Sequence, residues 1–65
     1  MIIKIFEKRK EKGFTLEKLS KKTNISTSAL NNYENGLRSI NINQLELIAK
    51  ALGCRISDLY ESEYK

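Results

Sequence analysis

Apolar residues recur three or four positions apart along most of this 65-residue chain, which is the spacing of helices that bury one face. No segment of six residues alternates between apolar and polar in the way that a half-buried strand does. Isolated glycines stand where helical segments are expected to end, at Gly13, Gly36 and Gly53. The expected helices run from about Ile2 to Lys12 and begin just after Thr15, Ser26, Asn41 and Ser57. The pattern predicts an all-α fold, a compact bundle of five helices in one domain, residues 1–65.

The expected core consists of the residues on the apolar stripes of these helices. The first stripe carries Ile2, Ile5 and Phe6. The next three helices turn inward, in order, Leu16, Leu19 and Thr23, then Ala29, Leu30, Tyr33 and Leu37, then Ile42, Leu45, Ile48, Ala49 and Leu52. At the start of the fourth helix, Asn41 and Gln44 have the spacing of an N-cap and its return bond.

The second and third helices are joined by almost nothing. Thr15 and Ser26 are good N-caps, because their hydroxyls can accept from the free amides of a first helical turn. Asn24 tolerates the left-handed backbone of a helix end, and Ile25 follows it as an apolar anchor. Helix, tight turn and helix form the helix-turn-helix motif, whose second helix normally enters the major groove of DNA.

The outward face of the third helix carries small hydrogen-bonding side chains, namely Thr27, Ser28, Asn31, Asn32 and Asn35. Asn can bond adenine N6 and N7 together, and Ser and Thr can bond either kind of base edge. Because no Arg or Lys lies between Ser26 and Asn35, we expect an A/T-rich site. The alternative is that these side chains are ordinary solvated polar residues.

The charge distribution fits an anionic partner. The formal net charge is +4, and residues 1–25 carry eight basic and three acidic side chains. This balance of +5 suits double-stranded DNA, although a solvated helical surface is an equally simple explanation of charge alone.

Other classes of protein are poorly supported. The chain has one cysteine and no histidine, so we expect no disulfide, no metal, no cofactor and no catalytic site. We find neither a signal peptide nor an apolar run long enough to cross a membrane, so we expect a cytoplasmic protein without a membrane partner. A purely structural helical bundle remains an alternative, but it would not require the polar face of the third helix.

Two charged residues fall on inward stripes. Arg9 follows Ile5 and Phe6 by one helical turn, and Glu34 follows Leu30 in the same way. A buried charge without a partner is costly, so we expect Arg9 and Glu34 to form an ion pair. The alternative is that both side chains extend to water.

The chain resembles the phage repressor and Cro family, also called the XRE family. The resemblance extends from about Ile5 to Leu59 and rests on Arg9, Gly13, Leu19, Ile25, Ser26, Leu30, Glu34, Gly36, Leu45, Ala49, Leu52 and Gly53. It implies a lambda-repressor-like five-helix fold, a structural ion pair between Arg9 and Glu34, and symmetric dimers on operator DNA. It also implies base contacts from Thr27, Ser28 and Asn32, with Asn31 close by.

The resemblance places contacts with the DNA backbone around the third helix, at Thr15, Asn35, Arg38, Asn41 and Asn43. The family often has Gln where this chain has Leu16, and that glutamine helps to hold a phosphate beside the start of the second helix, so the resemblance does not carry this contact over to Leu16. For Lys12, Lys21 and Lys22, a phosphate contact and an exposed solubilising role are equally good interpretations.

Apolar residues near the C-terminus exceed what one short helix can cover, which predicts a homodimer interface. We expect Ile40, Tyr60 and Tyr64 in this interface, whereas Ile56 and Leu59 can instead close the core. The function indicated is a sequence-specific transcriptional regulator, a repressor, that binds operator DNA as a homodimer. The alternative is an antitoxin-type interaction module that also binds its own promoter.

Overall fold

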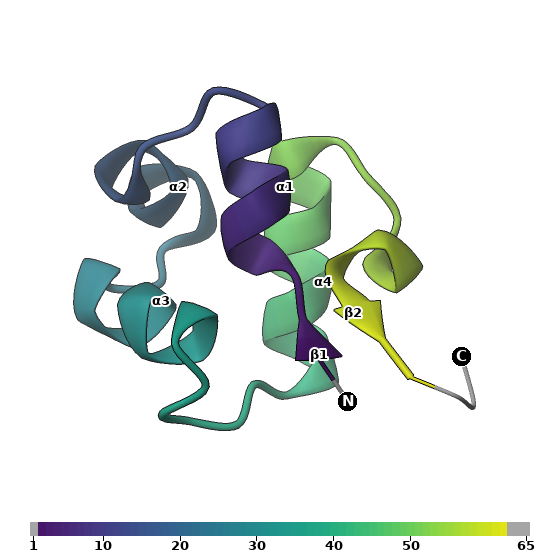
Figure 1. The fold of residues 1–65 in the computed structure, drawn as a ribbon. Coiled ribbons are helices and arrows are strands. Elements are labelled where there is room, and N and C mark those ends of the chain that lie inside the picture. The colour runs from purple at the N-terminus through teal and green to yellow at the C-terminus, as the bar shows by residue number, and fades with distance from the viewer. Residues whose placement is uncertain (1, 63–65) are drawn as a thin grey trace.

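The computed structural model describes residues 2–62 and is mostly helical. The elements, in chain order, are β1 (Ile2–Ile3), α1 (Ile5–Glu11), α2 (Leu16–Thr23), α3 (Thr27–Glu34), α4 (Ile42–Leu52), the 3₁₀ helix η1 (Ile56–Leu59) and β2 (Tyr60–Glu61). Helices α1 and α4 lie in the middle of the molecule, with α2 and α3 on one side and η1 with the two strands on the other (Figure 1).

The core lies between the helices and is closed by η1. Among residues 2–62, the largest fully buried side chains come from α1, α2, α3, α4 and η1 in turn: Ile5, Leu19, Leu30, Ile48 and Leu59. Helix α2 packs against both α3 and α4, while α1 contacts α3, α4 and η1. Each element therefore contributes one apolar face to a common core, and the outer faces of α2 and α3 are left at the surface.

Helices α2 and α3 begin just after the N-caps that the sequence indicates, and α2 ends at the expected Asn24. The hydroxyl of Thr15 accepts a hydrogen bond from the Lys18 amide, and the hydroxyl of Ser26 accepts one from the Ala29 amide, each at 3.1 Å. Asn24 ends α2 in the left-handed region, with φ of 63°. The turn of the helix-turn-helix is thus made by local capping on both sides.

The N-terminal prediction was wrong at its start, because α1 begins at Ile5 rather than at Ile2. Residues Ile2–Ile3 form strand β1, which pairs antiparallel with β2 in the register Ile2 to Glu61 and Ile3 to Tyr60. The Lys4 amide extends this contact by donating to the Leu59 carbonyl at 2.7 Å. A strand of two residues is too short to show alternation in the sequence. Within residues 2–62 the fold is mostly helical, as expected, but it has four α-helices and one 3₁₀ helix in place of five helices, and it adds a small sheet that the all-α prediction lacked.

Four apolar residues expected in the core are exposed, and the first of them, Ile2, is 63% exposed on strand β1. Phe6 is 48% exposed and lies beside the Arg9 guanidinium, 5.3 Å from the ring centre. Leu37 is 75% exposed because α3 has already ended and Gly36, with φ of 71°, turns the chain away from the helix stripe. Ile42 is 62% exposed because it occupies the first turn of α4, beyond the packed part of that helix.

Two caps also differ from the sequence prediction. Asn41 does cap α4, since its Oδ1 accepts from the Gln44 amide at 2.8 Å, but the Gln44 side chain does not return the bond. It instead accepts from the Tyr33 hydroxyl. The last helix begins after Arg55, whose amide donates to the Asp58 carboxylate at 3.1 Å, and Ser57 lies within the helix.

Candidate nucleic-acid interface

The outward face of α3 is formed by the polar side chains expected from the sequence. Thr27, Ser28 and Asn31 are exposed, and Asn32 is half-buried. The opposite face of α3 holds Leu30 and Tyr33 in the core, which fixes the direction in which these polar residues point. A convex helix with an exposed row of hydroxyls and amides has the shape and chemistry to contact base edges in a major groove.

The residues that flank α3 are exposed hydrogen-bonding groups or cations. All five expected backbone-contacting residues are at the surface, namely Thr15, Asn35, Arg38, Asn41 and Asn43. They belong to the starts of α2 and α4 and to the segment that follows α3. Together with the row on α3, they form what we call the polar rim.

Capping leaves the polar rim rich in hydrogen-bond donors. Thr15 and Asn41 each use a side-chain oxygen to accept a backbone amide of their own helix. The hydroxyl hydrogen of Thr15 and the amide hydrogens of Asn41 are left for an outside partner. Phosphate oxygens only accept hydrogen bonds, so the rim presents the atoms that a nucleic-acid backbone requires.

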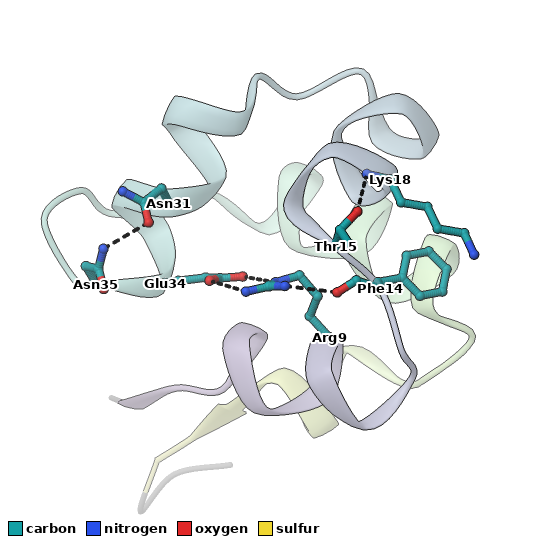
Figure 2. A network of polar contacts seen from close by, with 7 residues as sticks. All are labelled: Arg9, Phe14, Thr15, Lys18, Asn31, Glu34 and Asn35. Carbon is teal, nitrogen blue, oxygen red and sulfur yellow. Dashed lines mark hydrogen bonds and ion pairs between the residues drawn. The ribbon is translucent and has the colours of Figure 1, made fainter.

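An ion pair fixes α3 against α1. Arg9 donates from Nε to Glu34 Oε2 at 2.7 Å and from Nη2 to Glu34 Oε1 at 3.2 Å, and its Nη1 donates to the Phe14 carbonyl at 2.9 Å (Figure 2). The two side chains are only 9% and 4% exposed. The structure thus brings together the two inward charges noted in the sequence, in the bidentate geometry that makes such pairs strong.

A second link, between α3 and α4, was missed by sequence reasoning. Tyr33 is buried, and its hydroxyl donates to Gln44 Oε1, while the Gln44 amide is capped by Asn41. A buried tyrosine needs a partner for its hydroxyl, and this requirement was the available signal. The link joins the start of α4, where Asn41 and Asn43 lie, to the inner side of the helix that carries Asn32.

Two of the three residues expected at a homodimer interface lie within the described part of the chain, and both are partly covered. Ile40 and Tyr60 are half-buried, and Ile40 lines a surface pocket together with Ile3, Gly36, Arg38 and Ser39. Ile56 packs against the core and Leu59 is fully buried, so these two close the core. Tyr64 lies outside the described residues.

Cys54 is the one cysteine of the sequence, and its side chain is half-buried. Burial, followed by the negative charge of Asp58, raises the pKa of the Cys54 thiol, which keeps it protonated and weakly nucleophilic at neutral pH. Within residues 2–62, no group of three or more His, Cys, Asp or Glu side chains could hold a metal ion. None of the described helices combines the length and apolar character needed to span a bilayer.

A comparison with models of known protein families shows the family to which this chain belongs. A model of the helix-turn-helix family matches residues 5–59, from the start of α1 to the end of η1. The chain therefore belongs to the helix-turn-helix family of the phage repressor and Cro type, and it is a DNA-binding transcriptional regulator. Proteins of this family are regulators and are generally not enzymes. A comparison with curated proteins gave no match.

Proposed function

We propose that this protein is a repressor that binds a two-fold operator as a homodimer, acting as a single domain of residues 1–65. Helix α3 lies in the major groove, where Thr27, Ser28, Asn31 and Asn32 contact bases. Thr15, Asn35, Arg38, Asn41 and Asn43 contact the two DNA strands that flank the groove.

The observation that carries this proposal is the donor-rich polar rim. Side-chain oxygens of Thr15 and Asn41 are used inside their own helices, so the groups facing outward are donors. Arg38 adds an exposed cation after α3. Donors and a cation around a polar helix are suited to phosphates around a groove, and they do not suit an apolar protein partner.

We favour repression over activation because repression requires fewer contacts. A protein bound over a promoter excludes RNA polymerase without any further contact, whereas activation requires a contact with the polymerase. The dimer is part of the proposal because a two-fold protein matches an operator with two related half-sites about one helical turn apart. Ile40, Tyr60 and Tyr64 are the residues we assign to the interface between the two copies.

The test combines selection of an operator from random duplexes with binding measured over a range of salt concentrations. We expect a selected motif with two related half-sites, and an affinity that falls with a log–log slope of about −0.9 per phosphate contacted. Sedimentation with the selected operator should show two copies per site. A flat salt response, a motif without a dyad, or one copy per saturated operator would refute the proposal.

Two variants separate base reading from backbone binding. Asn32→Ala should cost about 1–3 kcal/mol on the selected site and relax the preference at one base pair. Arg38→Ala should weaken binding to all sequences and make the salt slope shallower. The matched control is Lys50→Ala, which removes one exposed positive charge from the far end of α4 and should leave the salt slope nearly unchanged.

A further inference from the structure

Asn35 is bonded twice to Asn31, one helical turn earlier. Its main-chain amide donates to the Asn31 carbonyl, and its side-chain Nδ2 donates to Asn31 Oδ1 at 3.1 Å. Figure 2 shows the two side chains at the end of α3, with the oxygen of Asn31 turned toward Asn35 and its nitrogen turned away. Both residues are exposed, so this contact lies on the surface that we assign to DNA.

Asn35 is held in place on both sides. Glu34, immediately before it, accepts the two hydrogen bonds from Arg9. Gly36, immediately after it, has the left-handed φ of 71° that ends the helix, and its amide donates to the Tyr33 carbonyl. The side chain that contacts Asn31 therefore starts from a fixed backbone position.

The bond determines which end of the Asn31 amide is available. An asparagine side chain has one oxygen that accepts and one nitrogen that donates. Oδ1 has two lone pairs and uses one of them to accept from Asn35. Because the amide is held with Oδ1 turned toward Asn35, Nδ2 is the end that is turned away from Asn35 and left unengaged (Figure 2). The bidentate contact with adenine requires both ends of the amide, whereas guanine O6 and N7 and thymine O4 only accept.

We propose that Asn35 is a positioning residue for specificity: it orients the Asn31 amide so that Asn31 donates to guanine or thymine and does not read adenine in the bidentate mode. This inference rests on the proposed major-groove role of α3. The inference gives Asn31 and Asn32 different roles. No hydrogen bond within residues 2–62 engages the side chain of Asn32, so both ends of its amide are available for the bidentate contact with adenine. The inference also adds guanine to a helix that contains no Arg or Lys.

The test replaces the hydrogen-bond donor that Asn35 presents to Asn31 with a group that only accepts hydrogen bonds. Selection with Asn31→Ala first identifies the base pair that Asn31 contacts, as the one position at which preference is lost. At that position the wild-type protein should favour guanine or thymine over cytosine by about tenfold. In Asn35→Asp the carboxylate can only accept, so the Asn31 amide turns, donates to Asp and presents Oδ1. The preference should then move to adenine or cytosine, while Asn35→Ala should broaden it.

Control variants at Asn43 make the same changes in charge and size on α4, away from Asn31. Asn43→Asp and Asn43→Ala should weaken binding without altering the preference at the Asn31 position. The hydrogen bond itself is measured without DNA: the Nδ2 hydrogens of Asn35 should exchange with solvent more slowly in the wild type than in Asn31→Ala.

Two results would overturn the inference in distinguishable ways. If the wild type selects a site but Asn35→Asp changes only the overall affinity, as Asn43→Asp does, then Asn35 does not orient Asn31 and the major-groove role stands. If the wild type selects no sequence at all, the proposed function fails and this inference fails with it.

Discussion

The two sides of the molecule are built in different ways. On one side, α2 and α3 each begin with a side-chain cap, at Thr15 and Ser26, and are joined through the left-handed Asn24. On the other side, β1 and β2 are strands of two residues each, paired across the ends of the described chain. The first side is organised by contacts between residues close in sequence, and the second by contacts between distant residues. Local contacts form at a low entropic cost, which makes the helix-turn-helix the better-determined half.

The two sides also differ in how deeply their ion pairs are buried. Arg9 and Glu34 are almost completely buried and bonded through two pairs of atoms. Lys4 and Glu61, beside the strands, are 3.6 Å apart with side chains 39% and 49% exposed. Removal of water strengthens the first pair and makes each partner dependent on the other, whereas water screens the second. Removing one partner of the buried pair should therefore cost far more stability than removing one partner of the exposed pair.

The largest expected effect comes from breaking the buried pair. Glu34→Ala leaves the Arg9 guanidinium buried without its carboxylate, which should lower the free energy of unfolding by about 3–5 kcal/mol. Denaturant unfolding followed by circular dichroism measures this change. Glu46→Ala is the matched control, because Glu46 is an exposed helical glutamate and its loss should change stability by less than about 0.5 kcal/mol.

A double-mutant cycle shows whether the pair is the cause. Removing both charges eliminates the unpaired group, so the variant with Arg9→Ala and Glu34→Ala should be less destabilised than the sum of the two single variants. Strict additivity would mean that each side chain acts through its own packing. The contrast between the two sides of the molecule would then lose its main energetic support.

A smaller effect is expected at the turn. Asn24 has φ of 63°, a conformation that costs an ordinary residue about 1–2 kcal/mol. Asn24→Ala should therefore lower the free energy of unfolding by about 1 kcal/mol, and Asn24→Gly, which adopts this backbone without strain, should stay close to the wild type. Thermal unfolding of the two variants side by side measures the difference. Equal stability of both would show that the turn tolerates any residue.

The same division explains how far the sequence could be interpreted. The helix-turn-helix could be predicted from local signals, namely the N-caps Thr15 and Ser26 and the turn residue Asn24. The outward residues of α3 follow from the period of an α-helix. The ion pair between Arg9 and Glu34 could also be predicted from the sequence, because a charge on an apolar stripe is costly to bury without a partner of opposite charge. In contrast, Ile2–Ile3 has the composition of either a helix start or a strand, and its partner lies at the other end of the chain.

The prediction that Leu37 and Ile42 are buried was wrong for a related reason. Helical periodicity assigns Leu37 and Ile42 to buried stripes, yet the helices that carry those stripes end or begin beside them. Periodicity describes a helix without stating its ends, and burial at an end depends on what packs there. The contact between Asn35 and Asn31 could not be inferred for the same reason, since it depends on the geometry of the helix C-terminus.

The smallest expected effect belongs to the strand side. Lys4→Gln removes the exposed pair with Glu61 and should change the free energy of unfolding by only about 0.2–1 kcal/mol, because both groups are already hydrated. The change should shrink further when salt is raised, since exposed charges are screened over about 8–10 Å at moderate ionic strength. Denaturant unfolding at low and high salt checks both points. A loss as large as that of Glu34→Ala would show that the short sheet fastens the ends of the fold as firmly as the buried pair fastens α1 to α3, and the contrast between the two sides would disappear.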